Sequence, residues 1–517
     1  MIIGLKTTPR HMAGGGLLAA LTFAVASACT EKVWPAAVAA VVTYLLVAAT
    51  FRGSTIYDWT QLRRHRKDPL SPSVVASSEG AAVILSPERS EATVWMELTP
   101  AKRLQVVTTG DTWTTLPELD LDALSEMMDH GGISLERIEA VTAGLSAVIP
   151  HGAPTVTRTV MGDSPTYLGS RSFLLVTLRL DSASQAIRSR SVGTTHAEGT
   201  HRTVLQAAAR IQIRLGGMGI RARVLSQPQV EAVSKDHLSH VADSLDNPGW
   251  SSLGGSEFPA VVMAPQSATA EQTTQWRSLP TRRTFEVQSV GRGMRGLSRG
   301  YALTLVAERA LPSLPKSSGL RPLGGQQVQS LSRIVPVAST MPLALPAASS
   351  TPTTWVGGLG LYLGNSEDAE KVSLTLTPFD GGNVYVSGGG ITLAQQLVLR
   401  IAALSLTVDV RTNTGDEETT RMWRQFVDGL ETPLVTFDDN PDPDIAVVLP
   451  GGERSIGDDQ VALVITDQVP RRGVDASIVA VSGSDNRSTT LTVTSGSEQK
   501  EVPWVLTAAE REYIVDA

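Results

Sequence analysis

Four carboxylates lie within seven residues near the end of the chain, in the order Asp438, Asp439, Asn440, Pro441, Asp442, Pro443 and Asp444. Carboxylate oxygens bind divalent cations, and Asp442 and Asp444 form a D-x-D string like that of metal-dependent glycosyltransferases. The alternative functional hypothesis is therefore a membrane-anchored glycosyltransferase-like enzyme that uses this acidic loop with a divalent metal. The prolines equally suit a solvated turn before a strand at 445–449, which is the interpretation we favour.

Three consecutive glycines, Gly388, Gly389 and Gly390, join an expected strand at 384–386 to an expected helix at 393–404. Backbone N–H groups at the start of a helix can hold an anion, so this segment is a candidate ligand loop. No Lys-Ser/Thr pair follows the glycines, which excludes a nucleotide-hydrolysing P-loop. A tight turn is the favoured interpretation, and an anion-regulated scaffold is a third hypothesis.

The glycines at 291, 293 and 296 match the G-x-G-x-x-G string of dinucleotide sites. That mechanism needs a helix after the glycines, whereas strand-like residues lie on both sides of this segment, at 284–290 and 301–306. We therefore predict a glycine-rich hairpin between two strands.

Histidines could serve as metal ligands, and His196 with Glu198 has the H-x-E spacing of zinc deaminases. Those enzymes also need a P-C-x-x-C segment, and the chain has one cysteine, Cys29. His196, His201, His237 and His240 are expected to be solvated loop residues. No Ser/His/Asp or Cys/His arrangement emerges, so we predict no catalytic residues, no cofactor and no resident metal.

Composition narrows the class of protein. The chain has 517 residues, of which 42% are hydrophobic and 18% charged, enough for a buried core in two to four domains. These values exclude a disordered acidic polymer, and the chain lacks the excess of Lys and Arg that is typical of nucleic-acid-binding proteins. The single cysteine excludes a disulfide framework.

The net charge of −7 is unevenly distributed along the chain. Residues 1–67 carry eight Lys/Arg and two Asp/Glu, which gives +6, whereas residues 413–517 carry eight Lys/Arg and twenty Asp/Glu, which gives −12. The residues between them are close to neutral. The chain therefore has a basic N-terminal zone and an acidic distal region.

Two apolar runs without a charged residue lie in the basic zone, at 12–29 and 33–51. Each is about the length of a membrane-spanning helix. Because only residues 30–32 separate them, we predict a transmembrane hairpin in contact with the lipid bilayer. Trp34 and Trp59 occupy positions typical of interfacial anchors.

The basic residues predict the orientation of this hairpin. Positive charges concentrate on cytoplasmic segments, and here they follow the second run: Arg52, Arg63, Arg64, Arg66 and Lys67. We therefore expect an inner (plasma) membrane protein with both termini in the cytoplasm. A signal peptide ending near Cys29 and a buried soluble hairpin are the competing interpretations, and neither explains the basic cluster as simply.

The sequence of the remaining residues predicts that they form an α/β (α+β) cytoplasmic region. One unit consists of a strand at 173–180, a helix at 199–217 and a strand at 220–225. Another consists of strands at 359–363, 372–376 and 384–386, a helix at 393–404 and a strand at 406–410. We expect two similar subdomains, which could reflect a duplication. The predicted division is 1–11 cytoplasmic N-terminus, 12–29 and 33–51 transmembrane helices, 52–80 basic juxtamembrane segment and linker, 81–310 first subdomain, 311–354 Pro/Ser-rich connection, and 355–517 second subdomain with the acidic distal region.

The connection at 311–354 has the composition of a linker. It also contains five apolar residues with the capacity to pack: Leu323, Val328, Leu331, Ile334 and Val335. We therefore expect it to be partly structured.

Taken together, these features resemble the EccE family, membrane components of type VII (ESX) secretion systems. The resemblance is carried by residues 171–181, the helix that follows Gly199, residues 219–225 and residues 320–327, and it extends to the helix at 392–404 and residues 406–410. It implies a non-catalytic structural subunit that supports protein export, at the periphery of an inner-membrane complex with EccB, EccC and EccD. Since EccC is the ATPase of that complex, the missing P-loop is consistent with the resemblance, which implies no catalytic residues.

Overall fold

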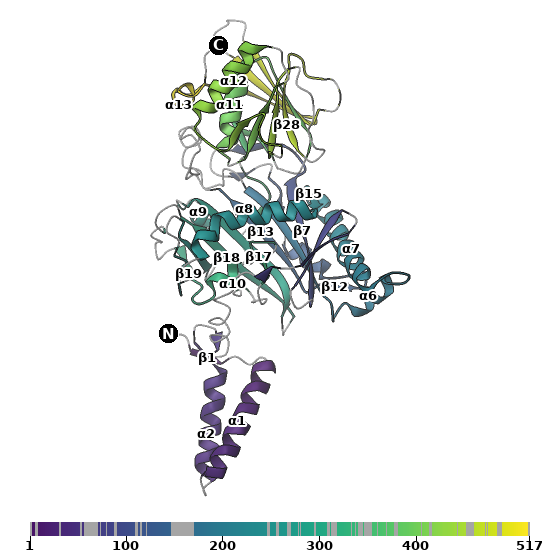
Figure 1. The fold of residues 1–517 in the computed structure, drawn as a ribbon, viewed down its shortest axis with the longest axis vertical. Helices are drawn as coiled ribbons and strands as arrows, with labels where there is room; N and C mark the ends of the chain where they lie inside the picture. Colours follow the sequence, from purple (N-terminus) through teal and green to yellow (C-terminus); the bar gives the residue numbers. More distant parts are fainter. Residues whose placement is uncertain are drawn as a thin grey trace.

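In the computed structural model of the chain, the described residues are 3–5, 9–29, 33–51, 54–55, 71–72, 74–78, 80–86, 90–108, 112–113, 116–119, 121–145, 170–245, 249–254, 258–265, 270–277, 279, 281–293, 296–307, 311, 318–331, 333–336, 338–339, 345, 354–358, 360–368, 370–376, 381–404, 406–412, 416–441, 443–450, 460–470, 472, 474–482 and 489–514. They form a mixed α/β protein with several sheets, preceded by two N-terminal helices (Figure 1).

The two N-terminal helices, α1 (Pro9–Cys29) and α2 (Val33–Ala48), pack against each other as a hairpin (Figure 1). The predicted pair of helices is therefore confirmed. The second helix is shorter than the predicted run, because residues 49–51 form strand β2 (Ala49–Phe51), which pairs with β1 (Ile3–Leu5). No helix among the described residues is both long enough and apolar enough to cross a membrane.

The first large sheet has ten described strands, and all of their pairings are antiparallel. Its order is β19-β16-β18-β17-β13-β14-β7-β6-β5, and β15 also pairs with β7. The strands are β5 (Val74–Ser78), β6 (Ala81–Leu85), β7 (Glu91–Pro100), β13 (Arg137–Gly144), β14 (Ser170–Arg179), β15 (Ile220–Val224), β16 (Ala260–Pro265), β17 (Arg283–Gly293), β18 (Gly296–Val306) and β19 (Leu320–Pro322).

Two long helices cover opposite faces of this sheet. Val204 and Ile211 of α7 (His196–Gly217) pack with Leu174 of β14, whereas Val233 of α8 (Gln227–Leu245) packs with Phe173. Successive residues of β14 therefore enter different cores, which explains why this strand is apolar on both faces.

The predicted strand, helix and strand of the first unit are confirmed as β14, α7 and β15. Helix α7 begins where the Thr195 side chain accepts a hydrogen bond from the Glu198 N–H, at 3.2 Å. The second strand does not return beside the first. β15 pairs with β7, so that β7 lies between β14 and β15.

The connection between the subdomains contributes to the first core, as the sequence predicted. Leu323, Leu331, Ile334 and Val335 are buried, and Val328 packs against them. This part of the connection contains β19 and the short helix α10 (Gln327–Leu331). It is therefore an integral part of the first subdomain.

A small sheet joins chain segments that are far apart in sequence. Its order is β22-β23-β8-β9, from β22 (Leu361–Asn365), β23 (Lys371–Leu374), β8 (Leu104–Thr108) and β9 (Thr112–Trp113). β7 lies in the first large sheet, and the next strand, β8, pairs with β23. Leu104 accordingly belongs to the core of the second subdomain, although its position lies within 81–310.

The second large sheet has the order β26-β25-β27-β28-β24-β29-β30-β31, and its first six strands are parallel. The strands are β24 (Asn383–Ser387), β25 (Val408–Arg411), β26 (Val435–Phe437), β27 (Ile445–Val448), β28 (Val461–Ile465), β29 (Ala476–Ser482), β30 (Thr489–Ser495) and β31 (Glu498–Pro503). Helices α11 (Gly390–Ala402) and α12 (Glu417–Gly429) follow β24 and β25, and α13 (Ala508–Arg511) lies near the end of the chain.

The predicted similarity of the two subdomains is wrong in sheet topology, because one sheet is antiparallel and the other mostly parallel. A strand–helix–strand pattern in the sequence does not specify which neighbour a returning strand pairs with, and this accounts for the error. The remaining elements are β3 (Ser54–Thr55), β4 (Ser71–Pro72), β10 (Glu118–Leu119), α4 (Leu121–Ser125), the 3₁₀ helix Glu126–Met128, β11 (Asp129–His130), β12 (Ile133–Ser134), α6 (Ser184–Arg190), α9 (Ala270–Arg277), β20 (Ala338–Ser339) and β21 (Thr354–Trp355).

Candidate functional site

The carboxyl edge of the parallel sheet is the place in this fold where a ligand is expected. In such sheets, ligands bind where connections from neighbouring strands leave in opposite directions. β28 and β24 are neighbours of this kind: β24 leads through α11 to β25 on one side, and β28 leads to β29 on the other. A cavity of about 560 Å³ lies at this point.

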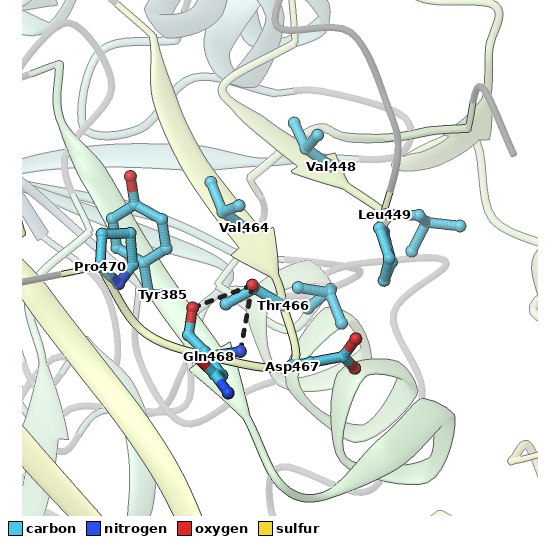
Figure 2. Close-up of a pocket in the computed structure, with 10 residues that line it drawn as sticks. Tyr385, Val448, Leu449, Val464, Thr466, Asp467, Gln468 and Pro470 are labelled. Carbon is cyan, nitrogen blue, oxygen red and sulfur yellow. Dashed lines mark hydrogen bonds between the residues drawn. The ribbon is translucent and has the colours of Figure 1, made fainter.

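The floor of this cavity, hereafter the edge pocket, is a row of three side chains from neighbouring strands. Val448 of β27 pairs in register with Val464 of β28, and Val464 pairs with Tyr385 of β24 (Figure 2). The walls come from the residues that follow β27 and β28. The described residues that line the pocket are Tyr385, Val448, Leu449, Pro450, Val464, Ile465, Thr466, Asp467, Gln468 and Pro470.

A tight turn after β28 forms one wall of the edge pocket. The Thr466 hydroxyl donates to the Gln468 carbonyl oxygen at 3.1 Å and accepts from the Gln468 N–H at 3.3 Å (Figure 2). Asp467, between them, is exposed at the rim. It makes no hydrogen bond or ion pair with another described residue, so its carboxylate is open to a ligand.

The three glycines of the candidate ligand loop lie at the junction of β24 and α11, as predicted. Gly388 has φ +83°, and a Cβ there would lie 2.2 Å from the Ala480 carbonyl oxygen. Gly390 has φ +60°. Backbone conformation at both positions, and close packing at Gly388, therefore explain these glycines without a ligand.

The structure does not bring together Asp438 and Asp444, the first and last carboxylates of the acidic loop. The Asp438 carboxylate accepts from the Thr412 N–H at 3.2 Å, at the carboxyl end of β25, while that of Asp444 accepts from the Thr407 N–H at 2.8 Å, before β25 begins. Thr412 follows Thr407 by five positions of extended chain, a distance of about 16 Å. Asp438 and Asp444 therefore cannot share one metal ion.

The individual aspartates have structural partners or face solvent. Burial raises the pKa of Asp444, against the hydrogen bonds from Thr407 that favour the carboxylate. Asp439 is exposed, and Asp442 lies outside the described residues. Within the described part of the chain, no group of three or more His, Cys, Asp or Glu residues has the geometry of a metal site.

The prediction that the histidines are solvated loop residues is wrong, because all four lie on helices. His196 is the exposed first residue of α7, His201 is buried on the same helix, and His237 is fully buried on α8. The spacing of Val230, Val233, His237 and Val241 places them on one face of α8, a signal in the sequence that identifies His237 as a core residue.

Helix α8 carries a charge cluster that sequence inspection missed. Asp236 contacts His240 at 3.5 Å and Arg283 of β17 at 3.3 Å. Burial would raise the pKa of Asp236, but the hydrogen bond with His240 and the charge of Arg283 outweigh burial and lower it. Burial lowers the pKa of neighbouring His237 to about 3, so this imidazole is neutral at physiological pH.

The remaining predicted sites are placed as follows. The glycine-rich segment after 290 is a hairpin, as predicted, in which Gly293 of β17 pairs with Gly296 of β18. Trp34 lies on α2 with 74% of its surface exposed. The other predicted membrane-flanking residues, Arg52, Trp59, Arg63, Arg64, Arg66 and Lys67, lie outside the described residues.

The architecture defines the chain as an α/β protein with an antiparallel and a mostly parallel sheet, preceded by an apolar helical hairpin. Residues 169–286 match the family model described as "Putative type VII ESX secretion system translocon, EccE". These residues are therefore similar to the EccE family, and the match confirms the resemblance predicted from the sequence. The matched segment runs from the start of β14 into β17 and includes α7, β15 and α8. No curated protein matches the chain.

Proposed function

We propose that the chain is a non-catalytic structural subunit of an inner-membrane type VII (ESX) secretion complex, in which it supports protein export. The observation that carries this proposal is the family match over residues 169–286. The matched residues include β14, β15, β16 and the start of β17 in the first sheet, and helices α7 and α8 on its two faces. They are therefore residues of a folded scaffold.

The N-terminal hairpin is the proposed membrane anchor. Large apolar side chains point outward along both helices, among them Leu17, Leu21, Val25, Val33 and Val41 with 57–71% of their surfaces exposed. Transfer of such surface from water to hydrocarbon is favourable by about 25 cal/mol per Å². A lipid bilayer would therefore stabilise this hairpin, whereas water would not.

Neither helix, as described, has both the length and the hydropathy of a membrane-spanning segment, so the proposed insertion of the pair requires local adjustment of the bilayer. At 1.5 Å per residue, the 21 residues of α1 extend about 32 Å and the 16 residues of α2 about 24 Å. The hydrocarbon core is about 30 Å thick, and a shorter helix is accommodated by thinning of the bilayer or by its flanking residues. Trp34 and Trp59 would be the interfacial anchors.

The basic residues after the hairpin support a cytoplasmic location for both termini and for both sheets. Five of them, Arg52, Arg63, Arg64, Arg66 and Lys67, follow the second helix, and the turn contains only Lys32. The expected partners in this membrane are subunits of the EccB, EccC and EccD type. The acidic distal region would suit a basic surface on one of them.

The separation of Asp438 from Asp444 supports a non-catalytic role, because these two carboxylates cannot bind one metal ion. Complementation of a deletion strain tests both parts of the proposal. We expect the deletion to abolish export of ESX substrates, and wild-type chain or an Asp438→Asn/Asp439→Asn variant to restore it. A chain without residues 1–51 should fail. Normal export in the deletion strain, or loss of export in the aspartate variant, would contradict the proposal.

A further inference from the structure

We propose that the edge pocket binds a small molecule with a flat ring and a positively charged or hydrogen-bond-donating group. The inference goes beyond the structural role proposed above. It rests on the shape of the floor, the rigidity of the walls and the charge of the rim.

The floor is flat and apolar because it consists of one side-chain row on a sheet. Val448, Val464 and Tyr385 are register neighbours on three adjacent strands. Strands lie about 4.8 Å apart, so the row is about 10 Å wide. A fused two-ring system fits this width, and a volume of about 560 Å³ is typical of pockets for small molecules.

The walls are preorganised by chain geometry. The Thr466 hydroxyl is occupied as both donor and acceptor within its own turn, and the Thr466 N–H donates to the Val386 carbonyl oxygen at 2.9 Å. Pro450 and Pro470 line the pocket, and proline has a fixed φ. Little conformational entropy would be lost when a ligand binds.

The charge of the rim selects the class of ligand. Asp467 is the one charged side chain among the described residues that line the pocket. Asp438 and Asp439 add negative charge to the same edge of the sheet, after β26. A phosphate or carboxylate would be repelled here, whereas an ammonium or amide N–H would find a carboxylate acceptor.

Two probes with the same ring and opposite charge test the proposal. Tryptamine carries an indole ring and an ammonium group, and indole-3-acetate carries the same ring and a carboxylate. Isothermal titration of the full chain in detergent should show saturable binding of tryptamine, at least about fivefold tighter than that of indole-3-acetate.

Matched variants locate the binding. Asp467→Asn should weaken tryptamine about fivefold and leave indole-3-acetate unchanged or slightly tighter. Asp428→Asn, an exposed change on α12 of the same subdomain, should alter neither affinity. The proposal is overturned if tryptamine does not bind, if the two probes bind equally, or if Asp467→Asn has no effect on tryptamine.

Discussion

The side-chain amide of Gln327 hydrogen-bonds both backbone groups of Val262. Its Oε1 accepts from the Val262 N–H at 2.7 Å, and its Nε2 donates to the Val262 carbonyl oxygen at 2.9 Å. Gln327 lies in the connection between the subdomains, and Val262 lies in β16. The amide occupies the place of a neighbouring strand just beyond β19, so the connection completes the edge of the first sheet.

Gln327→Leu should open this edge. The buried Val262 N–H would lose its acceptor, which lowers the free energy of local opening by about 2 kcal/mol. The amide of Val262 should therefore exchange about thirtyfold faster. Hydrogen–deuterium exchange of peptides that cover 260–265 measures this change. Gln425→Leu on the exposed face of α12 is the control. Unchanged exchange in the Gln327 variant would show that the connection is not part of the sheet edge.

Gly388→Ala should destabilise the second subdomain far more than Gly390→Ala. Both positions have positive φ, which costs a non-glycine residue about 1–2 kcal/mol, but only at Gly388 does a Cβ meet the Ala480 carbonyl oxygen. We expect a total cost of about 3 kcal/mol or more at Gly388. Thermal unfolding measures it as a drop of about 6–12 °C, against about 2–8 °C at Gly390. Equal shifts would favour a role for the glycines other than the tight turn.

His237 should make the first subdomain sensitive to acid. Its pKa of about 3 in the folded chain lies below the ordinary value of 6.5, so between these values only the unfolded chain takes up the proton. Folding stability therefore falls as pH decreases from 6.5 towards 3, by about 1.4 kcal/mol per pH unit from this residue. Above pH 6.5 the residue contributes no pH dependence.

His237→Gln tests this effect, because glutamine can still donate to the Ile334 carbonyl oxygen that His237 Nδ1 contacts. Denaturant unfolding at pH 6.5 and 4.5 should show about 2.3 kcal/mol less acid destabilisation in this variant than in wild type. His196→Gln, at the exposed start of α7, is the matched control. The same acid sensitivity in wild type and His237→Gln would contradict the buried, neutral state of the imidazole.

Asp444 should act as a structural residue and not as a metal ligand. Its carboxylate accepts from the N–H and hydroxyl of Thr407, at 2.8 and 2.9 Å. Asp444→Ala would leave these donors unpaired and cost about 2 kcal/mol, whereas exposed Asp439→Ala should cost less than about 0.5 kcal/mol. Thermal unfolding with and without Mn²⁺ completes the test. A midpoint that Mn²⁺ raises in wild type, but in neither variant, would restore the metal-site hypothesis.

Local patterns in the sequence predict the elements of this fold well. The apolar spacing of Val204, Ala208, Ile211 and Leu215 identifies the buried face of α7, and all four side chains are buried. The glycine-rich hairpin and the junction from β24 to α11 follow equally from short-range signals. Such signals are readable because helix and strand periods are set by backbone geometry.

Pairing between distant segments is not predictable in this way. β15 pairs with β7 and β8 pairs with β23, and these partners are separated by more than a hundred residues in sequence. The floor of the edge pocket likewise combines Tyr385, Val448 and Val464 from three separate strands. No local pattern specifies which strands become neighbours, so sequence inspection found the glycines and aspartates of this sheet but not its cavity.

Co-purification tests the proposal that the chain is a membrane-anchored subunit of a type VII secretion complex. Tagged full-length chain should be captured from membranes solubilised in mild detergent, and its partners should be identified by mass spectrometry. We predict recovery of EccB-, EccC- and EccD-type subunits with the full chain, and their loss when residues 1–51 are removed. Recovery of the tagged chain from the membrane fraction without any of these subunits would contradict the claim.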